Sequence, residues 1–117
     1  MVKLDNAIGS VCISSEVFMW LAGDAATRCF GVKGMAGRTK ETGLVQLLRR
    51  ESMTKGVNVH PNEDGSITIE LHIVVDHGMN LAALSDSIMN EVSYKVSSAT
   101  GVAVKAVNVY IDSMIMD

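Results

Sequence analysis

The chain has 117 residues, of which 48% are hydrophobic and 20% are charged, and its formal net charge at pH 7 is −3. This length and composition predict a single globular domain over residues 1–117, not a disordered chain of low hydrophobicity and high charge. The small negative charge argues against a general nucleic-acid-coating role, so we expect no nucleic-acid partner.

The apolar segments are short and interrupted by charged residues, and none supplies the ~20 apolar residues that cross a bilayer. Residues 1–6 do not show the basic and then apolar pattern of a secretory signal. Cys12 and Cys29 lie 17 positions apart, without a CxxC motif or a histidine at ligand spacing, so we expect reduced thiols and no cofactor. These features predict a cytoplasmic protein.

The first regular element is a strand at residues 9–14, where small polar and apolar residues alternate. Val11 and Ile13 share the face that we expect to be buried, and Cys12 lies on the other face. We expect this strand to be part of the main sheet.

A helix should follow, capped by Ser14 or Ser15 and ending near Cys29, because small and apolar residues recur at three- and four-residue steps. Residues 31–43 contain four glycines among basic residues and predict an ordered loop, whose beginning could add a further short strand. Residues 44–51 have the leucine spacing of a short amphipathic helix.

The second half of the chain has the clearest patterns. Residues 66–76 form the clearest strand, with apolar side chains at every second position from Ile67 to Val75. A helix that begins after Asn80 carries one continuous apolar stripe. The predicted elements are a strand at 56–60, a turn at 62–65, a strand at 66–76, a helix at 81–100 and a strand at 104–112.

This order predicts an α+β fold of two layers. We expect a mainly antiparallel sheet of about four strands, in ferredoxin-like element order, with two main helices on one face. The glycine-rich basic loop and the short helix form an insertion at residues 31–55. The order of the strands in the sheet stays open.

Several segments together resemble a known family. ISSEV at 13–17, GVKGMAG at 31–37 and VKAVNVYID at 104–112 resemble the alkaline-shock, envelope-stress family of Gram-positive bacteria. GLVQLLRRE at 43–51, followed by KGVNV at 55–59, is similar to the branch with the longer middle insertion.

This resemblance implies a small intracellular protein linked to envelope or alkaline stress. It implies a homo-oligomer, in some cases held at the inner face of the membrane by a separate anchor protein. Similar members are encoded beside a dihydroxyacetone-kinase-type protein that phosphorylates fatty acids, which implies a link to lipid metabolism. The resemblance supplies no catalytic residues.

One candidate surface is the polar face of the predicted sheet, which gathers side chains from several strands. An aromatic-containing open face of this kind favours packing against another copy or a partner, although simple solvation stays open. Zinc binding or acid–base chemistry would require the thiol, imidazole and carboxylate groups to converge. The interface candidates are Cys12, His60, Glu70, His72, Asn108 and Tyr110, with Asn58 and Thr68 on the same face.

The second candidate surface is the basic segment from Arg28 to Lys55, which has seven basic and two acidic residues. Its glycine spacing matches neither GxGxxG nor GxxxxGK[ST], which favours a solvated basic surface over a phosphate site. The anion-binding candidates are Lys33, Arg38, Lys40, Arg49 and Arg50.

The leading hypothesis is therefore a non-catalytic, self-associating interaction protein of the envelope-stress type. The alternative is a binding module for an anionic ligand, such as a phosphate-bearing small molecule, a lipid headgroup or nucleic acid, at the basic segment.

Overall fold

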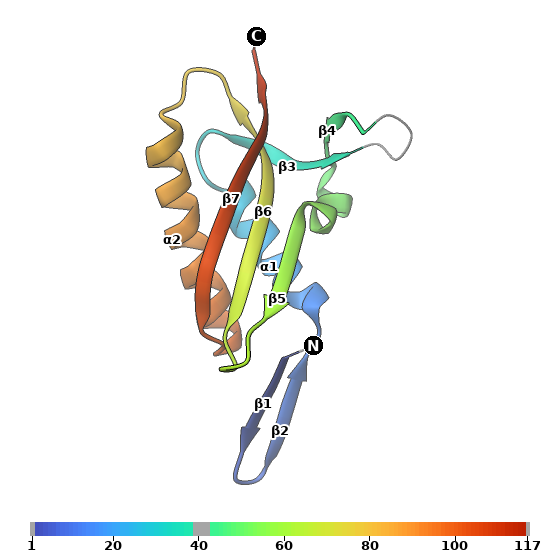
Figure 1. Ribbon diagram of the computed structural model, residues 1–117, viewed down its shortest axis with the longest axis vertical. Coiled ribbons are helices and arrows are strands. Elements are labelled where there is room, and N and C mark those ends of the chain that lie inside the picture. The colour runs from blue at the N-terminus through green and yellow to red at the C-terminus, as the bar shows by residue number, and fades with distance from the viewer. Residues whose placement is uncertain (1, 39–42, 117) are drawn as a thin grey trace.

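The structure is a computed structural model that describes residues 2–38 and 43–116. In it, α1 (Ser15–Thr27) and α2 (Leu81–Thr100) pack together on one face of a sheet (Figure 1). The predicted two-layer α+β fold is confirmed. The sheet consists of β3 (Val32–Arg38), β4 (Val45–Leu47), β5 (Val57–Pro61), β6 (Ile67–Asp76) and β7 (Val104–Ile115).

The central strand of the sheet is β6. It pairs in parallel with β7 along its whole length, and antiparallel with β5 over residues 67–71 and with β3 over residues 73–75. Since a strand has two edges and β7 occupies one, β5 and β3 share the other edge, one after the other. β4 then pairs antiparallel with β3. The sheet is thus mainly antiparallel, as predicted, with one parallel pair.

The core lies between β6 and the helices. The apolar set of β6 is fully buried from Ile67 through Val75, as its alternation predicted. α2 begins where predicted, because the Asn80 Oδ1 accepts a hydrogen bond from the Ala83 N–H at 3.1 Å. It ends at Gly101, which adopts a left-handed backbone conformation with φ of 75°. The buried stripe of α2 is Leu84, Ile88, Val92 and Val96.

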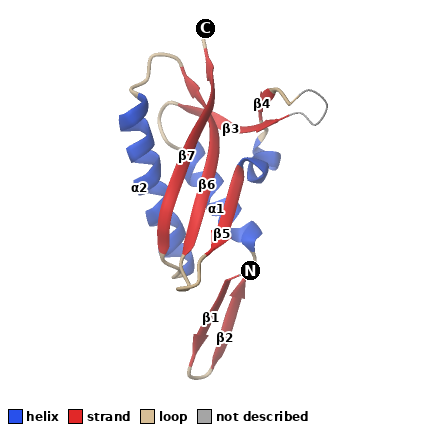
Figure 2. Cartoon of the chain, viewed as in Figure 1, coloured by secondary structure: helices blue, strands red, loops and turns tan. Residues whose placement is uncertain are grey.

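The predicted strand at 9–14 forms as β2 (Gly9–Ile13), but its expected place in the main sheet was wrong. It pairs antiparallel with β1 (Val2–Asn6) in a hairpin that extends from one end of the molecule (Figure 2). Residues 2–6 themselves alternate, and pairing across a two-residue turn costs little loop entropy. The main sheet therefore lacks the first strand of the predicted ferredoxin-like order. Val11, which we expected to be buried, is 51% exposed.

The prediction for the middle segment was also wrong in part. The expected loop contains β3, and the expected helix at 44–51 is replaced by β4 and a 3₁₀ helix, η1 (Arg50–Gly56). The reason is that two leucine side chains lie very close to the backbone of β3 at two of its glycines. A Cβ at Gly34 would lie 2.9 Å from a methyl of Leu47, and one at Gly37 would lie 2.8 Å from a methyl of Leu48. The leucines thus pack over bare backbone of β3.

No helix in the described part of the chain has the length and apolar composition needed to cross a membrane.

Candidate functional site

The open sheet face is the face of β5, β6 and β7 that points away from the helices (Figure 1). Strand register brings its side chains together: Glu70 of β6 lies between Asn58 on β5 and Asn108 on β7. In the same way, His72 lies beside Tyr110. The predicted face therefore exists, and residues from three strands meet on it.

Glu70 connects the three strands through its two carboxylate oxygens. Its Oε1 lies 2.6 Å from the Nε2 of His60, and its Oε2 accepts a hydrogen bond from the Tyr110 hydroxyl at 3.2 Å. The hydrogen bond with His60 is the main reason why the pKa of Glu70 lies below its usual range. The same carboxylate raises the pKa of Tyr110, since a hydrogen bond to Glu70 favours the protonated phenol.

The second part of the face is an aromatic stack. The ring of His72 lies over the ring of Tyr110, with centroids 4.8 Å apart and an interplanar angle of 12°. The Nδ1 of His72 lies 3.0 Å from the Oδ2 of Asp112. We call this set of five paired side chains the polar ladder: His60, Glu70, Tyr110, His72 and Asp112.

Two corrections apply to the predicted interface. Cys12 does not belong to it, because β2 pairs with β1 and not with the sheet, and the thiol is exposed on the hairpin. Asp112 was absent from the candidates, although it follows Tyr110 by two residues and so shares its face. Asn108 is exposed on the open face.

A zinc site would need three or more ligating side chains close together. No such group of His, Cys, Asp and Glu occurs within residues 2–38 and 43–116. The ladder carboxylates are already engaged by histidine and tyrosine partners.

The basic segment separates into two sets of side chains. Lys33 and Arg50 are neutralised: the Lys33 Nζ lies 3.2 Å from Asp76, and Arg50 lies 2.7 Å from Asp24. Arg50, and then Arg28, holds the pKa of Asp24 below its usual range.

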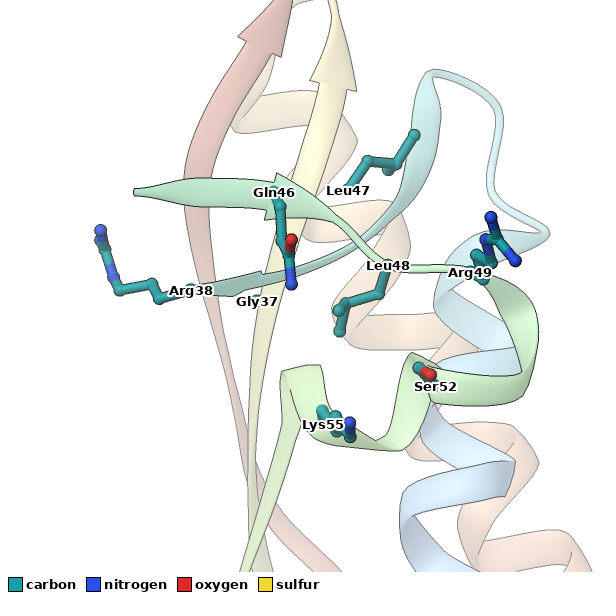
Figure 3. A pocket seen from close by; sticks show the side chains of 8 residues that line it. All are labelled: Gly37, Arg38, Gln46, Leu47, Leu48, Arg49, Ser52 and Lys55. Carbon is teal, nitrogen blue, oxygen red and sulfur yellow. The ribbon is translucent and has the colours of Figure 1, made fainter. Parts of the chain in front are cut away.

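The other set borders a hollow of about 570 Å³ (Figure 3). Arg38 from β3, Arg49 and Lys55 line it, together with Ser52. Figure 3 shows the Arg38 and Arg49 side chains extending to opposite sides of the hollow, so they do not converge on one point. Arg38 donates a hydrogen bond to the carbonyl of Gly43 at 3.0 Å.

Of the predicted anion-binding residues, the structure thus brings Arg38 and Arg49 to one hollow and places Lys33 and Arg50 in ion pairs. Lys40 lies outside the described residues. Lys55 was counted in the basic segment but missing from the candidates, because its place on the hollow depends on the turn of η1.

These features define a small α+β domain that presents one open sheet face with paired polar side chains and one basic hollow. Residues 3–116 match the family named for alkaline shock protein 23, which is described by a cell envelope-related function. The chain belongs to this family, and the resemblance seen in the sequence is confirmed.

Two relatives come from Gram-positive bacteria. The uncharacterized protein YloU of Bacillus subtilis is 33% identical over 114 residues, covering 97% of this chain and 94% of the relative. The uncharacterized protein Spy1614 of Streptococcus pyogenes is 31% identical over 114 residues, covering 97% and 93%. No solved structure matches the chain.

Proposed function

We propose that this protein is a non-catalytic scaffold of the cell envelope, which associates with further copies of itself and with partner proteins through the open sheet face. The envelope description of the family supports the setting. The polar ladder supports the surface, because it is the largest connected set of side-chain contacts on the uncovered face. In this proposal the protein acts on the cytoplasmic side, near the membrane, through an anchoring partner.

The ladder suits a surface that another protein covers. Burying a polar group without a hydrogen-bond partner is costly, and the ladder groups already have partners within the chain. Tyr110 is 43% exposed and stacks on His72, which fixes its ring in place. A rigid aromatic side chain amid paired polar groups is typical of the energetic centre of a protein interface.

The test is the mass of the protein in solution, measured by light scattering after size exclusion. Tyr110→Arg places a charge at the centre of the face and should reduce the wild-type oligomer. The matched control is Tyr94→Arg, because Tyr94 is 67% exposed on α2, away from the face. An oligomer that survives Tyr110→Arg unchanged would rule out self-association through this face.

A second candidate function is the binding of a phosphate-bearing ligand at the basic hollow. This candidate is supported by a difference between the basic side chains that form ion pairs and those that do not. Lys33 and Arg50 are engaged by carboxylates, whereas Arg49 and Lys55 have no ion pair to any described residue. Because the cations are spread around the hollow, an extended anionic surface fits them better than a single phosphate group.

This candidate can be tested with pyrophosphate and with phosphatidylglycerol vesicles. Binding should weaken steeply with added salt and on Arg49→Glu. It should not change on Lys105→Glu, since Lys105 is an exposed residue of β7 that does not line this hollow. Vesicle binding without pyrophosphate binding would identify a lipid surface, and salt-insensitive binding would overturn the candidate.

A further inference from the structure

The outer edge of β7 is the longest free strand edge in the described part of the chain. β7 has 12 residues, and among the described strands it pairs with β6 alone, so its other edge presents unpaired N–H and C=O groups. β7 has one residue more than β6 at Lys105 and again at Asp112, and each extra residue is a bulge. Residues 106–111, between the two bulges, pair regularly with β6. We call the free side of residues 106–111 the β7 edge.

The β7 edge differs from the other edge strands of the main sheet in having no protection. Proteins protect sheet edges with short strands, proline or charged side chains, because exposed backbone groups pair readily with other chains. The other side of the sheet follows this rule, since β5 has 5 residues and ends at Pro61, and β4 has 3. Residues 106–111 include no proline and no charged side chain. The β7 edge is therefore suited to receive a further strand.

The apolar layer between the sheet and the helices is incomplete beside this edge. The apolar residues of β6 are buried, whereas Val109 and Ile111, on the same face of β7, are only half-buried. Met89 and Ser93 of α2, together with Val107 of β7, line a hollow of about 200 Å³. Met89 is 36% exposed. A strand added beside β7 would place a side chain in this hollow and complete the layer.

A second copy of the chain does not fit on the β7 edge. Pairing two β7 edges under two-fold symmetry requires antiparallel strands and places both helix layers on the same face. Neighbouring strands lie about 4.8 Å apart, whereas packed helices need about 8–10 Å between their axes. α2 packs against β7, and Figure 1 shows it on the outer side of this strand, so the two α2 helices would overlap. The edge therefore fits a strand that carries no helix beside it.

An extended peptide segment meets these requirements. Its backbone supplies the C=O and N–H groups that match those of the edge, and its side chains alternate between the two faces of the sheet. The side chains that face α2 should be apolar, and those that extend the open sheet face beside Tyr110 should be polar. We propose that the β7 edge binds an extended segment of a partner protein, which adds a strand to the sheet and inserts an apolar side chain beside Met89.

Selection from a random peptide library displayed on phage tests this proposal. The full chain is the bait, and Met89→Lys is the comparison, because it places a charge in the hollow at a partly exposed position. Peptides selected on the wild type should have apolar residues at every second position and should bind Met89→Lys at least about tenfold more weakly. The matched control is Tyr94→Lys, which should bind within about twofold, since Tyr94 is exposed on α2 but does not line the hollow. No selected peptide, equal binding to Met89→Lys, or peptides without this period would overturn the proposal.

Selective methylation of the selected peptide tests the backbone pairing itself. In a strand at a sheet edge, alternate N–H groups point toward the neighbouring strand and the others point away from it. Methylating one alternate set of amide nitrogens should therefore weaken binding at least about tenfold, and methylating the other set should not. Equal weakening by both sets, or no weakening by either, contradicts strand addition.

Amide hydrogen exchange followed by NMR locates the peptide on the protein. Alternate amides within residues 106–111 should exchange rapidly in the free protein and become protected when the peptide is bound. The amides of β5 should not change, because β5 lies on the other side of β6. Protection of the β7 edge in the free protein would mean that a second copy already covers it, which contradicts the proposal.

The β7 edge and the open sheet face can fail separately. Tyr110→Arg changes a side chain of the face and leaves the backbone of the edge in place, whereas Met89→Lys changes the helix layer on the other side of the sheet. Peptide binding lost in Met89→Lys, with the mass of the protein unchanged, supports the edge whether or not Tyr110→Arg alters the oligomer. A reduced mass of Met89→Lys would instead assign the edge to contact between copies and overturn the proposal.

Discussion

Replacing Gly56 by alanine tests the most crowded point in the sheet. Gly56 ends η1 directly before β5, at the place where β3 and β5 share the edge of β6. A Cβ at this position would lie 2.9 Å from the carbonyl oxygen of Ala36, 3.0 Å from the Cβ of Met35 and 3.2 Å from the carbonyl oxygen of His72. All three atoms belong to fixed parts of the structure and cannot rotate away.

The size of the effect follows from two opposing terms. Overpacking of a rigid site costs about 1–3 kcal/mol. Alanine also restricts the unfolded chain, which stabilises the folded state by about 0.4–1 kcal/mol. We therefore expect Gly56→Ala to reduce the free energy of unfolding by about 1–2 kcal/mol.

Urea unfolding followed by circular dichroism measures this change. With a denaturant slope of about 1–2 kcal/mol/M, the midpoint should fall by about 1 M. Gly9→Ala is the matched control, because Gly9 has no neighbouring atom within 4 Å of the added Cβ. A Gly56→Ala midpoint at or above that of the wild type would refute the close approach.

Further predictions concern pH and helix capping. The lowered pKa of Glu70 means that its contact with His60 adds stability above about pH 4.3, which is lost as the pH falls. The difference in urea midpoint between the wild type and Glu70→Gln should therefore shrink from pH 5 to about pH 3. The raised pKa of Tyr110 has the opposite effect on the pH dependence of stability. The hydrogen bond from Tyr110 to Glu70 stabilises the folded state fully below about pH 10, and this stabilisation is lost as the pH rises further. Tyr110→Phe should therefore abolish this loss of stability at high pH. Asn80→Ala should cost about 1 kcal/mol in thermal unfolding, while Asn80→Asp should retain the cap.

The sequence predicts best the elements that are long and buried on one side. The residues of β6 alternate between buried and half-buried positions from Ile67 to Ile73, because one face meets the helices and the other is open, while Val74 is buried as well. The cap at Asn80, the stripe of α2 and the stop at Gly101 are local signals, each with a direct physical cause.

The sequence-based predictions were wrong where the structure of a segment depends on which other part of the chain it packs against. The alternation at 9–13 is equally suitable for a strand in the main sheet and for a hairpin with residues 2–6, and periodicity does not distinguish them. Leu44, Leu47 and Leu48 have helical spacing. Leu47 and Leu48 instead pack over the bare backbone of β3 at its glycines.

The sequence predicted which residues share the open sheet face, but it did not predict which of them contact one another. Period-two alternation assigned His60, Glu70, His72 and Tyr110 to one side of the sheet without the strand order. The contacts among them depend on β7 lying parallel to β6 in register, which no local pattern encodes.

The contacts within the polar ladder also help to decide whether the open sheet face is simply solvated or is covered by a partner protein. Ion pairs and hydrogen bonds exposed to water contribute about 0–1 kcal/mol each, because water competes for the same groups. The ladder has three hydrogen-bonded contacts and one ring stack across three strands, and both of its contacts at Glu70 are exposed, so they add little to the stability of an isolated domain. They matter more when water is excluded, since a paired group can be covered at a lower cost than an unpaired one. Tyr110→Arg should accordingly change association far more than unfolding, whereas a solvated face would show little change in association.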